Sequence, residues 1–190
     1  MRKLIMWNVV TLDGYFEGSQ PWDLSFHNIV WGKELEAFGL EQLHNTDYLL
    51  FGRKTYEGMA DYWSNAPADE QQDIARLMNS LPKLVCSETL QVTEWNNSSL
   101  IKGNIAAEIL KLKQQGRKDI FVFGSANLSE TLINEDLFDE YRICIAPVIL
   151  GNGRPLFSKG LTPKNLALLS TKPLLTGGVL LKYGKEKVSI

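Results

Sequence analysis

Apolar residues gather in short runs along this chain, and between the runs apolar positions recur at helical spacing. A run that is apolar throughout is typical of a strand buried on both faces, whereas spacing of three and four residues is typical of a helix. The pattern predicts strands over residues 3–10, 47–51, 83–86, 100–101, 119–123, 141–149, 166–171 and 179–183. It predicts helices over residues 26–43, 55–62, 68–79, 105–115 and 125–133.

Strands and helices alternate through the first two thirds of the chain, whereas the last third has strands without helices. Such alternation implies an α/β fold with a mostly parallel sheet and right-handed crossovers. We expect the last strands to join the same sheet as antiparallel strands, with a hairpin turn at Gly177 and Gly178. Pro147, inside the expected strand 141–149, fits a bulge or an edge better than a sheet interior. The length of 190 residues suits a single domain, 1–190.

Composition narrows the class of protein. Hydrophobic residues make up 44% and charged residues 22% of the chain, with a formal net charge of -2, so no basic excess indicates a nucleic-acid partner. With only two histidines and two cysteines, no spacing predicts a metal site. No apolar run approaches the roughly 20 residues of a membrane span, and the N-terminal run is too short for a signal peptide. We expect a soluble cytoplasmic protein.

Two places share one pattern, an apolar strand that runs through glycine into a helix. The first strand ends at Gly52 and is followed by Arg53 and Lys54, and the second ends at Gly124. Glycine lets the backbone approach a ligand, and the free N–H groups and dipole at a helix start favour an anion. Two such junctions favour a ligand with more than one phosphate, such as a dinucleotide.

Five motifs over residues 1 to about 160 resemble those of the dihydrofolate reductase-like superfamily: Thr11–Tyr15, Gly52–Glu57, Phe123–Leu128, Phe138–Glu140 and Pro147–Gly153. The most similar branch is the reductase domain of bifunctional riboflavin-biosynthesis deaminase-reductases. This chain resembles a stand-alone member, because the zinc-deaminase signature is absent. The resemblance implies a three-layer α/β/α fold, NADPH as cofactor, and reduction of a small heterocyclic or ribosylaminouracil-like substrate by hydride transfer.

The resemblance also implies which residues hold NADPH. The cofactor phosphates would lie at Gly52, Arg53, Lys54 and Thr55. The pyrophosphate and nicotinamide side would lie at Gly124, Ser125, Ala126, Asn127 and Leu128, and the adenosine 2′-phosphate would reach Ser87. Each has a plainer alternative: Arg53 as an exposed arginine, Gly124 as a packing glycine, Ser87 as a loop serine. A cation at a helix start is repelled by the dipole unless an anion is near, which favours a ligand beside Arg53.

Three residues are candidates for binding substrate or donating a proton: Asp13, His27 and Asp61. His27 stands three positions after Leu24, where true dihydrofolate reductases carry the acid that binds the pterin, and this departure disfavours folate reduction. The alternative for Asp13 is that it only shapes an Asp-Gly turn. The alternative for His27 is a surface or core histidine without a catalytic role. A bound water is a further possible source of the proton. Arg154 is either a contact for a substrate phosphate or a surface turn residue.

Two other functions stay open from sequence. One is a protein that keeps the fold and binds nucleotide without catalysis, and the other is a weak dihydrofolate reductase. Family resemblance also favours a homodimer, in which the apolar segments 166–169 and 179–181 pair across subunits or are instead buried against their own sheet.

Overall fold

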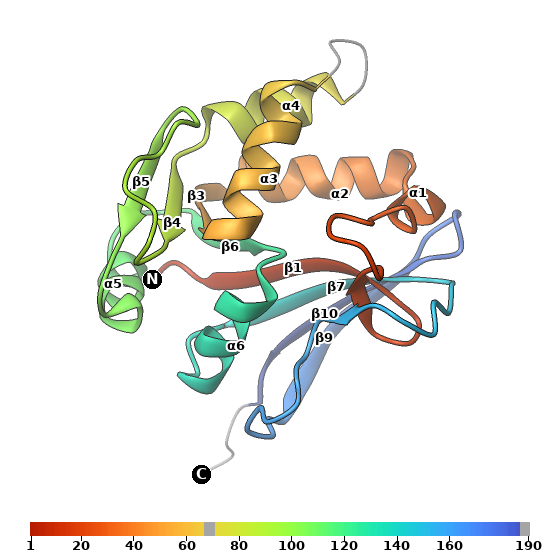
Figure 1. The fold of residues 1–190 in the computed structure, drawn as a ribbon. Helices are drawn as coiled ribbons and strands as arrows, with labels where there is room; N and C mark the ends of the chain where they lie inside the picture. Colours follow the sequence, from red (N-terminus) through yellow and green to blue (C-terminus); the bar gives the residue numbers. More distant parts are fainter. Residues whose placement is uncertain (67–70, 187–190) are drawn as a thin grey trace.

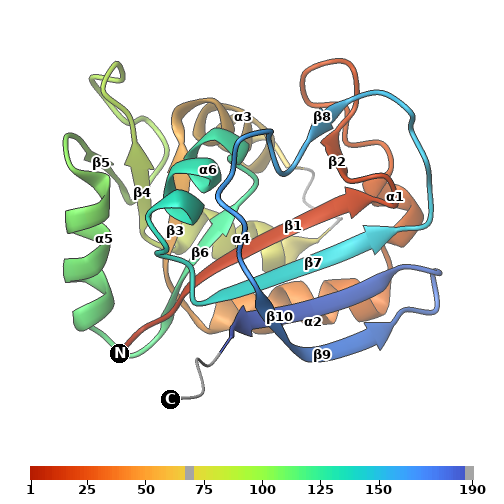
Figure 2. The same ribbon diagram turned by 90° about the horizontal axis from the view of Figure 1, so that it is seen from below.

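The computed structural model describes residues 1–66 and 71–186. Eight strands form one sheet in the order β5-β4-β3-β6-β1-β7-β10-β9 (Figures 1 and 2). Neighbouring strands from β5 to β7 pair in parallel, and β10 pairs antiparallel with both β7 and β9. The strands are β1 (Leu4–Thr11), β3 (Thr46–Gly52), β4 (Lys83–Cys86), β5 (Ser98–Ile101), β6 (Asp119–Phe123), β7 (Glu140–Ala146), β9 (Leu166–Pro173) and β10 (Val179–Lys185).

Helices cover both faces of this sheet, which gives three layers (Figure 2). One face carries α5 (Ile105–Gln114) and α6 (Ala126–Asn134), and the other carries α1 (His27–Val30), α2 (Lys33–His44), α3 (Arg53–Ser64) and α4 (Gln72–Ser80). Alternate residues of β1 face opposite cores: Leu4 and Met6 pack toward α5 and α6, and Ile5 packs toward α2, α3 and α4. The predicted α/β class, the mostly parallel sheet and the antiparallel C-terminal strands are confirmed.

Several predicted boundaries differ from the structure. The helix predicted over 26–43 is divided into α1 and α2, because the backbone is extended at Trp31 and Gly32. Strand β7 ends at Ala146, one residue before Pro147, so the proline terminates the strand rather than forming a bulge inside it. The predicted start at Ala68 lies outside the described residues, and the described helix α4 begins at Gln72.

A small second sheet was not predicted. Strand β2 (Tyr15–Glu17) pairs antiparallel with β8 (Arg154–Pro155), which joins the loop after β1 to the loop after β7. Strands of three and two residues are too short to produce a periodic signal in the sequence. Within residues 1–66 and 71–186, no helix has the length and apolar character needed to cross a membrane.

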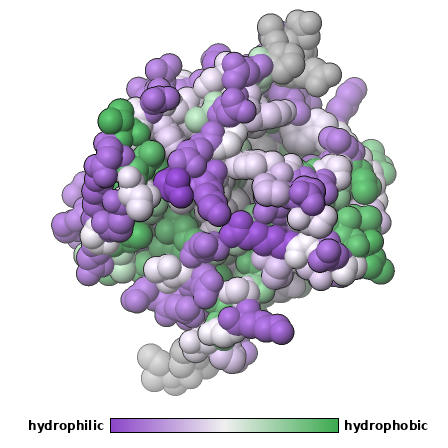
Figure 3. Space-filling view, in the orientation of Figure 1, coloured by the Kyte–Doolittle hydropathy of each residue, from purple (hydrophilic) through white to green (hydrophobic). Residues whose placement is uncertain are grey.

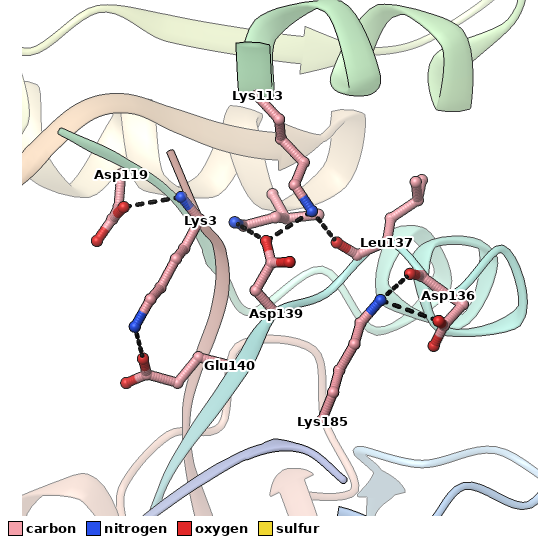
Figure 4. Close-up of polar contacts among 9 residues, drawn as sticks. Lys3, Lys113, Asp119, Asp136, Leu137, Asp139, Glu140 and Lys185 are labelled. Carbon is pink, nitrogen blue, oxygen red and sulfur yellow. Dashed lines mark hydrogen bonds and ion pairs between the residues drawn. The ribbon is translucent and has the colours of Figure 1, made fainter. Parts of the chain in front are cut away.

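Ion pairs at the amino-terminal edge of the main sheet connect neighbouring secondary-structure elements (Figure 4). The buried Lys113 Nζ on α5 lies 2.6 Å from Asp139 Oδ2 and donates a hydrogen bond to the Leu137 carbonyl oxygen at 3.0 Å. Asp139 also accepts the Leu4 backbone N–H at 2.8 Å, so one carboxylate connects α5, β1 and the start of β7. Lys3 reaches the buried Glu140 at 3.1 Å. Charged groups at this edge therefore hold secondary-structure elements together.

The surface seen in Figure 3 is mostly hydrophilic, with apolar patches at its margins. The right-hand margin, where the turns after β7 and β9 lie in Figure 1, carries one such patch. The most exposed large apolar side chains in the turns after β1, β7 and β9 are Leu12, Ile149 and Leu175.

Candidate functional site

The two strand–glycine–helix junctions lie in contact at the carboxyl edge of the sheet. Strands β3 and β6 are parallel neighbours, so α3 and α6 both begin at this edge. The Gly52 N–H donates a hydrogen bond to Ser125 Oγ at 3.1 Å. A Cβ added at Gly124 would lie 3.3 Å from the Thr55 methyl carbon, a closer approach than most side chains tolerate. Glycine at position 124 therefore lets the second junction lie directly against the first helix.

The chain turns sharply from β6 into α6. Gly124 and Ser125 both adopt left-handed backbone angles, with φ of 61° and 58°. This conformation is strained for serine, and the hydrogen bond from Gly52 to its side chain helps to hold it. The turn leaves the start of α6 beside the start of α3.

The starts of α3 and α6 carry no negative charge of their own. Helices α3 and α6 have no acidic residue in the first turn and no side-chain cap. By contrast, α2, α4 and α5 begin with Glu34 and Glu36, Asp73 and Glu108. A first-turn acid stabilises a helix by opposing its dipole, so α3 and α6 leave their positive ends open to an external anion.

The first turn of α3 adds two cations to this positive end. Arg53 and Lys54 are both exposed. Arg53 reaches Glu57 at 3.2 Å, an exposed i,i+4 pair that contributes little. The Lys54 side chain makes no hydrogen bond or ion pair with any residue in the described part of the chain. Both side chains are therefore available to an anionic ligand.

Other predicted cofactor contacts are already engaged within the protein. Ser125 Oγ accepts the Gly52 N–H, and Leu128, on the buried side of α6, packs in the core against the sheet. Asn127 Oδ1 accepts a hydrogen bond from Arg154 at 2.7 Å, a contact that the sequence did not reveal. Ala126 is half-buried, so its backbone N–H is the group that it offers a ligand.

Ser87 lies beside the first junction, because Cys86 pairs with Gly52 across β3 and β4. Its hydroxyl oxygen accepts the backbone N–H groups of Thr89 and Leu90 at 3.2 and 3.0 Å. These bonds give Ser87 a turn-forming role, and contact with a 2′-phosphate stays a prediction.

Asp13 connects the loop after β1 to the loop after β7 through hydrogen bonds. Its carboxylate accepts the Thr11 hydroxyl at 2.6 Å and the backbone N–H groups of Gly151 and Leu150 at 2.8 and 3.3 Å. The Thr11 hydrogen bond and then these backbone bonds lower the pKa of Asp13 below its ordinary value. Asp13 is therefore an ionised acceptor at neutral pH, which fits the turn alternative better than proton donation.

The other two proton-donor candidates occupy different surroundings. Burial lowers the pKa of His27 to about 4, so its imidazole is neutral at pH 7, and its ring lies edge-on to Phe26. Asp61 is exposed near the end of α3, where it accepts a hydrogen bond from Asn65 at 3.3 Å. Neither the ionised Asp13 nor the neutral His27 therefore carries an acidic proton at neutral pH.

Comparisons with known proteins agree with this architecture. The family model described as the RibD C-terminal domain matches residues 2–180. The uncharacterized protein YyaP of Bacillus subtilis (strain 168) is 34% identical over 184 residues, which cover 96% of this chain and 94% of YyaP.

Two solved structures share the fold. A putative riboflavin biosynthesis protein from Shewanella sp. PV-4 superposes with a TM-score of 0.78 at 21% identity, covering 97% of this chain and 99% of that one. Dihydrofolate reductase from Enterococcus faecalis, solved in complex with NADP(H), superposes with a TM-score of 0.65 at 16% identity, covering 97% of each chain. The resemblance seen in the sequence motifs is confirmed, and the chain belongs to the RibD C-terminal domain family.

Proposed function

We propose that this protein is an NADPH-dependent reductase that acts on a small heterocyclic or ribosylaminouracil-like substrate. The observation that carries the proposal is the contact between the Gly52 and Gly124 junctions, where two helices without first-turn acids begin side by side. Membership of the RibD C-terminal domain family supports reductase chemistry. The related fold of Enterococcus faecalis dihydrofolate reductase, solved with NADP(H), supports the choice of cofactor.

The residues present suit a dinucleotide phosphate chain. Arg53 can bind a phosphate through two parallel hydrogen bonds, and Lys54 adds a second positive charge beside the free N–H groups of α3. The backbone at Gly124 and the first turn of α6 would bind the pyrophosphate on its other side. Ser87, at the end of the neighbouring strand, is the proposed contact for the 2′-phosphate.

When bound, NADPH supplies the hydride, and the protein must orient the substrate, exclude water and provide a proton. Because Asp13 is ionised and His27 is neutral, we propose a bound water as the proton source. Asp13 would then position the loop containing Gly151, and Asp61 stays a candidate for contact with substrate.

Ligand-dependent melting tests the proposed cofactor. NADPH at one hundred times its dissociation constant should raise the free energy of unfolding by roughly 2.7 kcal/mol, and NADH should do so less. Arg53→Gln should weaken this effect, while Arg117→Gln at the amino edge serves as a control. No change in melting temperature at millimolar NADPH would overturn the proposal.

A second candidate is a nucleotide-binding protein without catalysis, favoured because neither Asp13 nor His27 carries an acidic proton at neutral pH. This alternative predicts that NADPH binds but is not oxidised in the presence of pterins, ribosylaminouracils or quinones. Turnover with any member of that panel would eliminate it. The neutral His27 at the pterin-acid position likewise disfavours the third alternative, a weak dihydrofolate reductase.

We also propose that the protein forms a homodimer through β9. Strand β10 is paired on both sides within the chain, so the segment 179–181 has no free strand edge, whereas β9 lies at the end of the sheet. Leu168 and Leu169 on β9 are 56% and 55% exposed, which is unusual for an isolated edge strand. Leu168→Lys should therefore convert a dimer to a monomer in light-scattering chromatography, and a monomeric parent protein would overturn this proposal.

A further inference from the structure

The loop of residues 18–24, called here the Trp22 loop, has a strained conformation. Trp22 adopts a left-handed φ of 63°, which is rare for a bulky side chain. Its backbone N–H donates a 2.7 Å hydrogen bond to Glu17 Oε1. Within the loop, the Gly18 N–H bonds the Asp23 carbonyl oxygen at 2.8 Å. Such strain persists only when the surroundings hold the segment in place, and here Glu17 is one of the groups that do so.

The Trp22 ring lies against a glycine inside helix α3. A Cβ added at Gly58 would lie 1.9 Å from Trp22 Cζ2, so no other residue at position 58 is compatible with this contact. Glycine inside a helix costs about 1 kcal/mol relative to alanine. Gly58 follows Arg53 by five residues, which places the ring about 7.5 Å along the helix axis from the first junction. Trp22 is 43% exposed, so part of its surface remains open to solvent or ligand.

A single arginine connects this loop to the second junction. Glu17 and Arg154 are cross-strand partners in the small β2–β8 sheet, and Arg154 Nη1 lies 3.6 Å from Glu17 Oε2. The same guanidinium donates to Asn127 Oδ1 in the first turn of α6 at 2.7 Å and lies over the Phe16 ring. The contacts therefore run from α6 through Arg154 and Glu17 to Trp22 and on to α3.

We infer that Arg154 is a positioning residue that holds the Trp22 loop on α3 and links this loop to the first turn of α6. The ligand side of the inference rests on the proposed function, in which dinucleotide phosphates bind at α6. A phosphate that accepts a hydrogen bond from Arg154 would hold the guanidinium beside the first turn of α6. Glu17 would remain paired with another nitrogen of the same guanidinium. A docked Trp22 loop in turn holds Arg154 ready for the phosphate, so the two events stabilise each other.

Fluorine NMR of protein labelled with 5-fluorotryptophan tests the positioning role without ligand. The chain has five tryptophans, and Trp22→Phe identifies the Trp22 resonance. Gly58→Ala should displace the ring and shift that resonance, whereas Gly39→Ala in α2, where the new Cβ meets only Ile74 at 3.7 Å, should not. Arg154→Gln should shift the Trp22 resonance toward its position in Gly58→Ala, while Arg117→Gln leaves it unchanged. An unmoved resonance in Arg154→Gln would overturn the inference.

Binding measurements on the same variants test the link to the ligand. Arg154→Gln and Gly58→Ala should each weaken NADPH binding about tenfold, within the usual range of coupling between sites. Arg154→Lys should not restore wild-type affinity, because a point charge cannot bridge Asn127 and Glu17 as a planar guanidinium does. If Gly58→Ala binds NADPH as tightly as the parent, the loop is not linked to the ligand and the inference fails. If the parent protein itself binds no NADPH, the proposed function fails instead. The fluorine NMR comparison without ligand then decides whether Arg154 positions the Trp22 loop.

Discussion

The two edges of the central sheet use charge in different ways. At the amino edge, cations lie against carboxylates: Arg2 Nη2 is 2.7 Å from Asp47, and Lys113 Nζ is 2.6 Å from Asp139. At the carboxyl edge, Lys54 has no partner among the described residues, and Arg53 has only an exposed one. The amino edge thus uses these charges to join secondary-structure elements, whereas the start of α3 at the carboxyl edge keeps its positive charges available for an external anion.

This contrast also separates stability from function. Removing one member of a buried pair leaves the other uncompensated, so changes at the amino edge should affect folding. Exposed cations at a helix start oppose the dipole, so changes at the carboxyl edge should affect binding while leaving stability equal or higher. Substitutions at the two edges therefore test the contrast directly.

The largest expected effect is the loss of Lys113. Lys113→Met removes the buried partner of Asp139 and the hydrogen bond to the Leu137 carbonyl oxygen, and should lower the free energy of unfolding by about 3 kcal/mol. Urea denaturation measures the change. The control Lys111→Met on the same helix breaks only an exposed i,i+3 pair and should cost less than about 0.5 kcal/mol. Equal losses in the two variants would show that the Lys113 pair has no special role in stability.

Acid titration should separate the buried His27 from the amino-edge carboxylates by pH. The pKa of His27 is lowered from 6.5 in the unfolded chain to about 4 in the folded protein, so the unfolded state binds the extra proton between these values. Stability is therefore fully present above pH 6.5 and is lost as the pH falls toward 4, with a slope of at most about 1.4 kcal/mol per pH unit.

The amino-edge carboxylates should respond at lower pH. Burial alone would raise the pKa of Glu140, but its Arg142 and Lys3 partners together lower it below its ordinary value of 4.5. The stability that Glu140 contributes is thus present above pH 4.5 and is lost only below it. His27→Phe should remove the loss between pH 6.5 and 4 and keep the loss at lower pH, as followed by urea denaturation across the range. If His27→Phe still loses stability between pH 6.5 and 4, another titrating group causes that loss.

The sequence identifies the junctions well because their signal is local. An apolar run followed by Gly52 or Gly124 and a helical pattern needs only adjacent residues, and the parallel pairing of β3 and β6 then brings the junctions together. The contacts of Arg154 with Asn127 and of Trp22 with Gly58 join residues 27 and 36 positions apart through loop conformations. Such contacts depend on left-handed backbone angles and on the short β2–β8 sheet, which leave no periodic pattern.

The protonation states of Asp13 and His27 also could not be predicted from the sequence. Asp13 acquires its low pKa from the Thr11 hydroxyl and from backbone N–H groups of a loop about 140 residues away. His27 loses its charge through burial that only the packed α1 segment provides. Sequence therefore identified residues capable of proton transfer, while tertiary contacts determine which of them can carry a proton at neutral pH.

The smallest expected change in stability gives the sharpest test of the carboxyl edge. Lys54→Glu places an acid in the first turn of α3 and should raise the free energy of unfolding by about 0.5 kcal/mol, because the carboxylate opposes the dipole. The same substitution should weaken NADPH binding tenfold or more, since a negative charge replaces a cation beside the proposed phosphates. Lys33→Glu at the start of α2 is the matched control, with a similar gain in stability and no change in NADPH affinity. If Lys54→Glu instead lowers the free energy of unfolding and leaves NADPH binding intact, then Lys54 stabilises the fold, and the proposed contrast between the two edges is wrong.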